Sequence, residues 1–126
     1  MRIIQTERGW GGHFCCCRRC LFRRNTLLEL GDLRVVVSTV GNMGNLWDND
    51  GPSQEIGFNR YYETMIFHAQ FEDPYWEADV QRQIDVGVPW TIAEPVKPDS
   101  DLKANEMHEQ NIIAARKWMR RTKGKK

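Results

Sequence analysis

The chain has 126 residues, 40% hydrophobic and 28% charged, which suits one globular domain over residues 1–126 and excludes two ordinary ones. No apolar run approaches the ~18 residues of a membrane span, and no hydrophobic leader precedes a cleavage site, so we expect a cytoplasmic protein. The net charge of +1 hides +5 over residues 1–28, −11 over residues 29–109 and +7 over residues 110–126. The local electrostatic potential, and not the net charge, determines where an anion binds, so the basic ends are candidate anion sites.

The first predicted elements are strands. Residues 2–6 form a short apolar start, and a glycine-rich turn follows over residues 9–12. Residues 13–22 fit either a short helix or a bent strand, because their periodicity does not decide between the two. Residues 26–30 and 33–37 flank Gly31 and Asp32. This pattern predicts a β-hairpin whose second strand continues to Val40.

The middle of the chain continues the sheet. Residues 41–53 are rich in Gly and Asn and predict a long loop. Residues 55–56 have strand character, and residues 57–60 resemble a turn. Residues 61–71 and 75–80 predict two further strands that pair across residues 72–74. A last short strand is expected over residues 86–92, broken by Pro89.

One long helix is predicted at the C-terminal end, over residues 102–121, with Asp99 or Ser100 as its cap. Its acids lie early and its cations late, which suits the helix dipole. We expect His108 to be solvated or at an interface, and residues 122–126 to fray. The predicted fold is therefore α+β, with an antiparallel sheet of five to six strands and one long C-terminal helix.

The four cysteines crowd into six positions, at Cys15, Cys16, Cys17 and Cys20. Such close neighbours do not easily form unstrained disulfides with one another, so we expect reduced and buried thiols. An alternative is a small zinc protein that uses Cys15, Cys17, Cys20 and a histidine as ligands. The second ligand pair typical of structural zinc sites is missing, so no metal ligand is assigned.

No set of residues has a spacing that demands catalysis. The usual nucleophile and metalloprotease motifs are absent from the sequence. Glu63, Glu77 and Asp79 could gather around a divalent ion, but a solvated strand face is the more typical role for such acids. We therefore expect no enzyme activity, no catalytic residue and no cofactor.

The strongest chemical signal is a run of four arginines within seven residues, at positions 18, 19, 23 and 24, beside aromatic side chains. Guanidinium groups bind phosphate in a bidentate manner, and nucleic-acid bases stack on aromatic rings. The predicted ligand-binding residues are Trp10, Arg18, Arg19, Phe22, Arg23, Arg24, Ser38, Thr39, Arg60, Trp90 and Arg116. Two alternatives remain open. In the first, the basic face is only solvated or pairs with the acidic middle. In the second, the arginines and the basic tail bind nucleic acid.

Four stretches of the chain resemble a known family. They are RGWGGHF at residues 8–14, CLFRRNTL at residues 20–27, VVVSTVG at residues 35–41 and NRYYET at residues 59–64. Over most of the chain, roughly residues 2–121, the sequence is similar to the phage anti-Thoeris sponge family of the first class. No binding residue of that family is carried over to this chain.

The resemblance implies a function without turnover. Members of that family sequester the cyclic ADP-ribose isomers that TIR-domain enzymes of bacterial defence produce. Some also capture cyclic oligonucleotides at a second kind of site, and several assemble as hexamers. By resemblance, this chain is expected to be a phage- or prophage-encoded homo-oligomer, built from dimers and up to a hexamer. It would act in the bacterial cytoplasm against Thoeris or CBASS defence, with a cyclic nucleotide as its partner.

Overall fold

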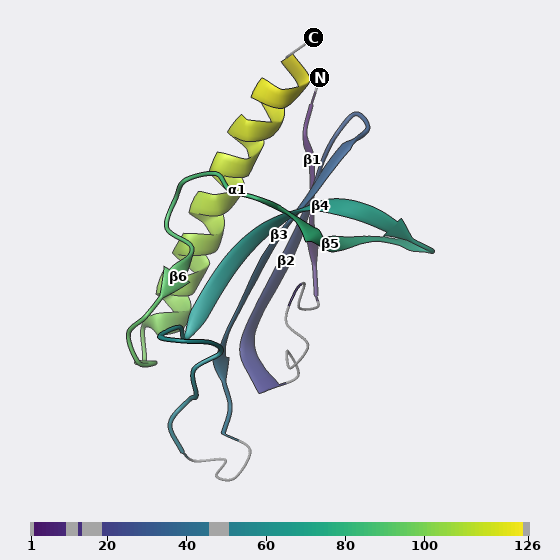
Figure 1. The fold of residues 1–126 in the computed structure, drawn as a ribbon. Coiled ribbons are helices and arrows are strands. Elements are labelled where there is room, and N and C mark those ends of the chain that lie inside the picture. The colour runs from purple at the N-terminus through teal and green to yellow at the C-terminus, as the bar shows by residue number, and fades with distance from the viewer. Residues whose placement is uncertain (1, 10–12, 14–18, 46–50, 125–126) are drawn as a thin grey trace.

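The computed structural model describes residues 2–9, 13, 19–45 and 51–124, and it shows the predicted α+β arrangement. The strands in chain order are β1 (Ile4–Arg8), β2 (Cys20–Leu30), β3 (Leu33–Met43), β4 (Tyr62–Glu72), β5 (Tyr75–Ile84) and β6 (Thr91–Ile92), and the helix α1 is Ser100–Gly124. The strand order in the antiparallel sheet is β1-β2-β3-β4-β5, and β6 pairs with β4. The start of β1 and the end of α1 lie at the same end of the molecule (Figure 1).

The hairpin of β2 and β3 is the prediction that the structure confirms most directly. Leu30 pairs with Leu33 across Gly31 and Asp32. Gly31 has a φ of 62°, a conformation that is open to glycine and strained for most other residues. The second strand runs three residues beyond its predicted end, to Met43, so the start of the predicted loop at residues 41–53 belongs to the sheet.

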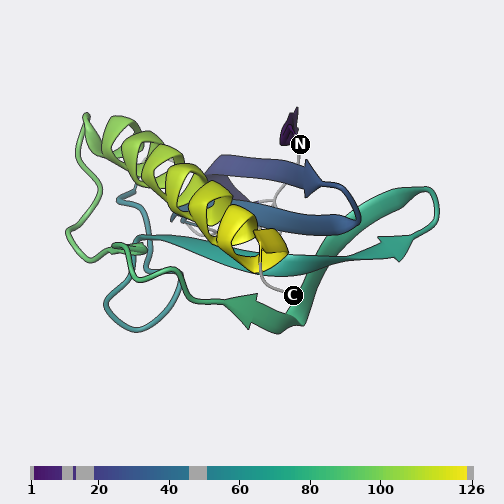
Figure 2. The ribbon, with the colours of Figure 1, turned by 90° about the horizontal axis from the view of Figure 1, so that it is seen from above.

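Helix α1 lies along one face of the sheet (Figure 2). Side chains of a strand alternate between its two faces, and those that face α1 form the main hydrophobic core. The sheet contributes Leu28, Leu30, Val35, Val37, Ile66 and Ile84 to this core, and α1 contributes Ile112, Ala115 and Met119. Burial of this apolar surface is the dominant favourable contribution to packing the helix on the sheet.

The opposite face of the central strands is also buried. In β3, Val36, Ser38 and Val40 alternate with the side chains that face the helix, and all three are fully buried. A strand buried on both faces reads as a continuous apolar run instead of an alternating one. The run Val35-Val36-Val37 shows this pattern in the sequence.

Two strands, β5 and β6, pair with the edge of β4 that faces away from β3. The β4–β5 hairpin turns across Asp73 and Pro74 as predicted, and a register shift interrupts the pairing between Phe67 and Ala69. The other predicted strands are much shorter. Residues 86–92 contribute only the two residues of β6, and residues 55–56 lie between isolated bridges at Gln54 and Gly57.

The helix begins and ends near its predicted bounds, extending to Gly124 into the tail that was expected to fray. Asp99 occupies the N-cap position, because its carbonyl accepts the first helical hydrogen bond, from the Lys103 N–H at 3.2 Å. The Ser100 hydroxyl instead accepts a hydrogen bond from the preceding Lys97 N–H at 2.7 Å. The Tyr62 hydroxyl donates to Asp101 Oδ1 at 2.6 Å and ties the start of α1 to β4. The described part of the chain contains no helix both long enough and apolar enough to cross a membrane.

Candidate functional site

A cavity of about 340 Å³ opens where β5 and β6 approach the same edge of β4. The β5 pairing reaches Ile66, and the β6 pairing covers Tyr62 and Glu63. Between them, Thr64 and Met65 are left at the cavity wall. The lining residues are Thr64, Met65, Ile66, Gln83, Ile84, Asp85, Val86, Val88, Trp90 and Asn111.

Trp90 is the aromatic side chain of this cavity, and the backbone on either side of it is held in place. Its carbonyl accepts a hydrogen bond from the Thr64 N–H at 2.8 Å. The carbonyl of the preceding Pro89 accepts one from Asn111 Nδ2 at 3.0 Å. The Trp90 residue nevertheless remains 43% exposed. Its ring therefore projects from a fixed stretch of backbone and is accessible to a ligand.

Arg60 lies beside Trp90, although the two residues are distant in the sequence. Its guanidinium carbon is 5.8 Å from the centroid of the Trp90 ring, within the range of a cation–π interaction. Its Nε lies 3.0 Å from Glu63 Oε2. The guanidinium also fills the space next to Gly57, where any side chain would collide with it. Two predicted ligand-binding residues are thus brought together: Trp90 lines the cavity, and Arg60 lies beside the Trp90 ring without lining the cavity itself.

A buried histidine supports Glu63 from the other side. His13 Nε2 lies 3.1 Å from Glu63 Oε1, and His13 Nδ1 lies 2.7 Å from Ser38 Oγ. A carboxylate only accepts hydrogen bonds, so Nε2 donates to Glu63, and in a neutral imidazole Nδ1 accepts from the Ser38 hydroxyl. The order Ser–His–Glu resembles a hydrolase triad in its connectivity.

The exposure of this triplet does not suit acyl transfer. Ser38 is fully buried, and the His13 side chain is 4% exposed. A nucleophile must reach a substrate carbon, and a hydroxyl enclosed by the sheet does not. The hydrogen bonds instead orient the Glu63 carboxylate, which in turn pairs with Arg60. Ser38, a predicted ligand-binding residue, is therefore separated from the guanidinium by two residues, His13 and Glu63.

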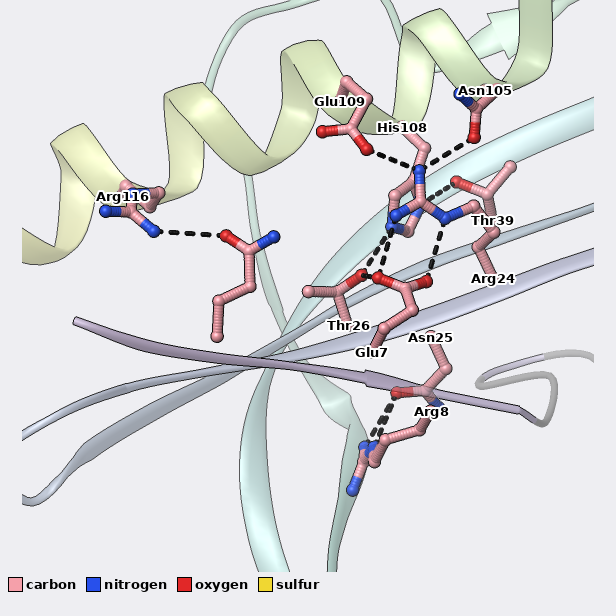
Figure 3. Close-up of polar contacts among 11 residues, drawn as sticks. Glu7, Arg8, Arg24, Asn25, Thr26, Thr39, Asn105, His108, Glu109 and Arg116 are labelled. Carbon is pink, nitrogen blue, oxygen red and sulfur yellow. Dashed lines mark hydrogen bonds and ion pairs between the residues drawn. The ribbon is translucent and has the colours of Figure 1, made fainter. Parts of the chain in front are cut away.

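A second polar cluster lies on the helix side of the sheet and centres on His108 (Figure 3). His108 Nε2 is 2.8 Å from Thr26 Oγ1, and Nδ1 is 2.6 Å from Thr39 Oγ1. Thr39 Oγ1 is also 2.6 Å from Thr64 Oγ1. His108 is fully buried, which corrects the expectation that it is solvated or at an interface.

The direction of the hydrogen bonds in this cluster follows from one anion. Thr26 donates its only hydroxyl proton to Glu7 Oε2 at 2.6 Å. It must therefore accept from His108, which places the proton on Nε2. Nδ1 then accepts from Thr39, which accepts from Thr64. The chain runs from Thr64 at the cavity wall to Glu7 on β1.

Two members of this chain, His108 and Glu7, have shifted pKa values. Burial, together with a smaller effect of the Arg24 cation, lowers the pKa of His108 to about 3, and the Glu7 anion opposes both effects. Burial alone would raise the pKa of Glu7, but hydrogen bonds from Arg24 and Thr26 outweigh it and the pKa lies below its usual value. His108 is thus neutral and Glu7 ionised at neutral pH.

Arg24 is engaged by its own chain. It donates to both carboxylate oxygens of Glu7 at 2.8 Å, to Asn105 at 2.9 Å and to Glu109 at 2.8 Å (Figure 3). These bonds connect β1, β2 and α1. A phosphate would have to displace two carboxylates to bind here, which makes Arg24 a structural clamp in this conformation.

The remaining predicted residues do not converge on the cavity. Arg19 donates to the Gly44 carbonyl and to Gln54, and Arg116 donates to Gln5 on the helix side. Phe22 packs edge-on against Tyr62, with 5.9 Å between ring centroids. Arg23 is exposed, and Thr39 belongs to the His108 cluster. Trp10 and Arg18 lie outside the described residues.

The structure tests the predictions about the cysteines only at Cys20. Cys20 is a thiol and is buried, as expected, whereas Cys15, Cys16 and Cys17 lie outside the described residues. Within the described ranges, no three side chains of His, Cys, Asp or Glu converge in a way that could hold a metal ion. Glu63 does not join Glu77 and Asp79 but pairs with His13 and Arg60.

Three residues of the site were not predicted: His13, Glu63 as an ion-pair partner, and Asn111. Their contacts span 25 residues between His13 and Ser38, 50 between His13 and Glu63, and 22 between Asn111 and Pro89. No local motif encodes such separations. The one available signal was the presence of polar residues inside apolar runs, such as Ser38 after three valines.

Comparison of the chain with protein-family models, with curated proteins and with solved structures finds no match.

Proposed function

We propose that this protein binds and sequesters a cyclic nucleotide immune signal without degrading it. The ligands that we favour are cyclic ADP-ribose isomers, followed by cyclic oligonucleotides. The observation that carries the proposal is the pairing of Trp90 and Arg60, with the ring lining the cavity and the guanidinium 5.8 Å from the ring centroid. An aromatic surface next to a guanidinium matches the two halves of a nucleotide.

The energetics of the pair favour such a ligand. Base stacking on an exposed aromatic ring contributes about 1–3 kcal/mol per base. Glu63 approaches Arg60 at Nε. The terminal nitrogens of Arg60 form no hydrogen bond with any residue that the structure describes. They can therefore bind phosphate oxygens without breaking an existing hydrogen bond.

Storage of the ligand suits the site better than turnover. The Ser38–His13–Glu63 triplet resembles hydrolytic machinery in its connectivity only, because its hydroxyl is fully buried. A protein that titrates a signal needs affinity and slow release. By the resemblance of its sequence, the protein would inhibit bacterial anti-phage defence in the cytoplasm of the host.

The ligand can also be shared between subunits of a homo-oligomer. Arg116 lies on the helix, on an exposed contact with Gln5, where it could reach a ligand held by a neighbouring chain. A monomer by light scattering at micromolar concentration would argue against this part of the proposal.

Isothermal titration with cyclic ADP-ribose isomers, cyclic dinucleotides and cyclic trinucleotides tests the proposed function. At least one of these ligands should release binding heat with the unchanged protein. Trp90→Ala and Arg60→Gln should each weaken binding at least about tenfold, which corresponds to 1.4 kcal/mol. Phe58→Ala, at an aromatic residue that is 85% exposed, and Arg2→Gln are the matched controls and should bind normally.

Two results would count against the proposal. Absence of heat with every ligand in the panel would refute it. A gel shift on DNA or RNA that weakens with salt, and that is lost when Lys123–Lys126 are deleted, would favour a nucleic-acid-binding protein instead.

A further inference from the structure

Asn111 lines the cavity and is almost completely buried, with 2% of its surface exposed. Both hydrogens of its amide nitrogen are used, one by the Pro89 carbonyl at 3.0 Å and one by the Met107 carbonyl at 2.8 Å. Two carbonyl partners fix the orientation of the amide, because an oxygen placed there would face two other acceptors.

The orientation leaves Asn111 Oδ1 as a hydrogen-bond acceptor for the cavity. No residue in the described ranges donates to this oxygen. This oxygen is not sealed off from solvent, so a ligand that supplies an N–H group there replaces a contact with water by a direct hydrogen bond. The amide is also held rigidly, which lowers the entropy lost on binding.

The charges around the cavity determine which part of a nucleotide enters it. Asp85 is the one charged residue among those that line the cavity, and its carboxylate accepts a hydrogen bond from the Gly87 N–H at 2.9 Å. An anionic phosphate is disfavoured next to it. The Arg60 cation is outside the cavity lining, with its guanidinium carbon 5.8 Å from the centroid of the Trp90 ring. The base therefore belongs inside the cavity and the phosphates belong near Arg60.

The cavity volume agrees with this orientation. Ligand pockets commonly measure about 300–1,000 Å³, and this one lies at the lower end with about 340 Å³. That volume is sufficient for one base stacked on Trp90. The remainder of the ligand would extend toward the solvent and Arg60.

We infer that the cavity is a base-reading subsite for adenine, in which the exocyclic amine donates a hydrogen bond to Asn111 Oδ1 while the ring stacks on Trp90. This inference rests on the proposed function and adds where the adenine base binds and which residue recognises its amine. Adenine carries an amine at the position where hypoxanthine carries a carbonyl oxygen. Hypoxanthine would therefore place an acceptor against an acceptor.

The test compares two ligands that differ only at this position. The probes are a cyclic ADP-ribose isomer joined through a ribose oxygen, which leaves the adenine amine free, and its inosine counterpart. Isothermal titration of the unchanged protein should show the inosine form binding about 10–100-fold more weakly. Asn111→Leu should bring the two affinities close together, whereas the control Asn105→Leu, on the same helix, should keep the difference.

The outcomes separate the two proposals. If both probes bind equally tightly and Trp90→Ala weakens both, the adenine inference is wrong and the proposed function stands. If neither probe binds the unchanged protein, and no other cyclic nucleotide does, both proposals fail. Thermal unfolding shows whether Asn111→Leu folds, and if it does not, the two probes on the unchanged protein still decide.

Discussion

At the scale of single residues, His108 shows how one buried side chain organises its surroundings. It accepts from Thr39 and donates to Thr26, so a single neutral tautomer satisfies both ring nitrogens. Protonation would place a second donor where Thr39 already donates, in a site shielded from water. The cost of charging this ring is the physical reason for its low pKa of about 3.

This low pKa predicts that the protein loses stability in mild acid. The unfolded chain binds a proton at His108 near pH 6.5, whereas the folded chain does so only near pH 3. Below pH 6.5 the unfolded state thus binds more protons, and the free energy of unfolding falls by up to about 1.4 kcal/mol per pH unit. Urea unfolding at pH 7 and pH 5 measures this effect.

A variant assigns the acid sensitivity to His108. In His108→Asn, the free energy of unfolding should differ less between pH 7 and pH 5 than it does in the unchanged protein, whatever the stability of the variant at pH 7. His68→Gln is the control, because burial and the Arg82 cation also lower the pKa of His68, and this half-buried ring contributes less. An unchanged slope in His108→Asn would show that another group titrates.

A second prediction at this scale concerns Gly57. A Cβ atom at this position would collide with the Arg60 guanidinium, which is the mobile end of a flexible side chain. Gly57→Ala should therefore displace Arg60 from Trp90 and weaken ligand binding as Arg60→Gln does, with the thermal unfolding midpoint little changed. Gly9→Ala, where nothing lies within 4 Å of the added atom, is the control. Normal affinity in Gly57→Ala would show that the position of Arg60 is not needed.

At the scale of elements, the edge strand β1 is joined to the helix mainly through Arg24. Its guanidinium holds Glu7 on β1 and Glu109 on α1, and Arg116 adds a bond from α1 to Gln5. On the opposite face, Arg8 donates to Asn25 Oδ1 at 2.9 Å and 2.8 Å (Figure 3). The basic N-terminal segment thus pairs in part with acids of its own chain.

Removal of the clamp should therefore reduce stability. We expect Arg24→Ala to lower the free energy of unfolding by about 1–2 kcal/mol, a moderate value because both carboxylates are about half exposed. Arg23→Ala, at the neighbouring exposed position, should have little effect. Urea unfolding of both variants gives the comparison, and equal stability of Arg24→Ala and the unchanged protein would contradict the clamp.

The elements also show what the sequence could predict. The β2–β3 hairpin was predictable because a Gly-Asp pair between two β-rich runs acts locally, and the helix was predictable from its composition and its charge order. The cavity was not, because it requires β5 and β6 to meet the same edge of β4. The arginine run is visible in the sequence as a chemical signal. Only the folded structure shows that Arg24 binds Glu7 and Glu109 of its own chain and that Arg60 lies beside Trp90.

At the scale of the whole molecule, the sheet separates two kinds of polar site. The helix side holds the closed His108 cluster, which stabilises the fold. The opposite side and the β4 edge hold His13, Glu63, Arg60 and Trp90, and there the aromatic ring and the guanidinium remain accessible. Thr64 touches both regions, because it ends the His108 chain and lines the cavity.

The proposed function requires that the protein hold a cyclic nucleotide and leave it intact. The most direct measurement incubates the protein with a cyclic ADP-ribose isomer, removes unbound ligand, denatures the protein by heat and identifies the released molecule by mass spectrometry. We predict release of the unaltered cyclic ligand in proportion to the protein, and a strong reduction in Trp90→Ala. Recovery of a linear or hydrolysed product, or of no nucleotide at all, would contradict the account.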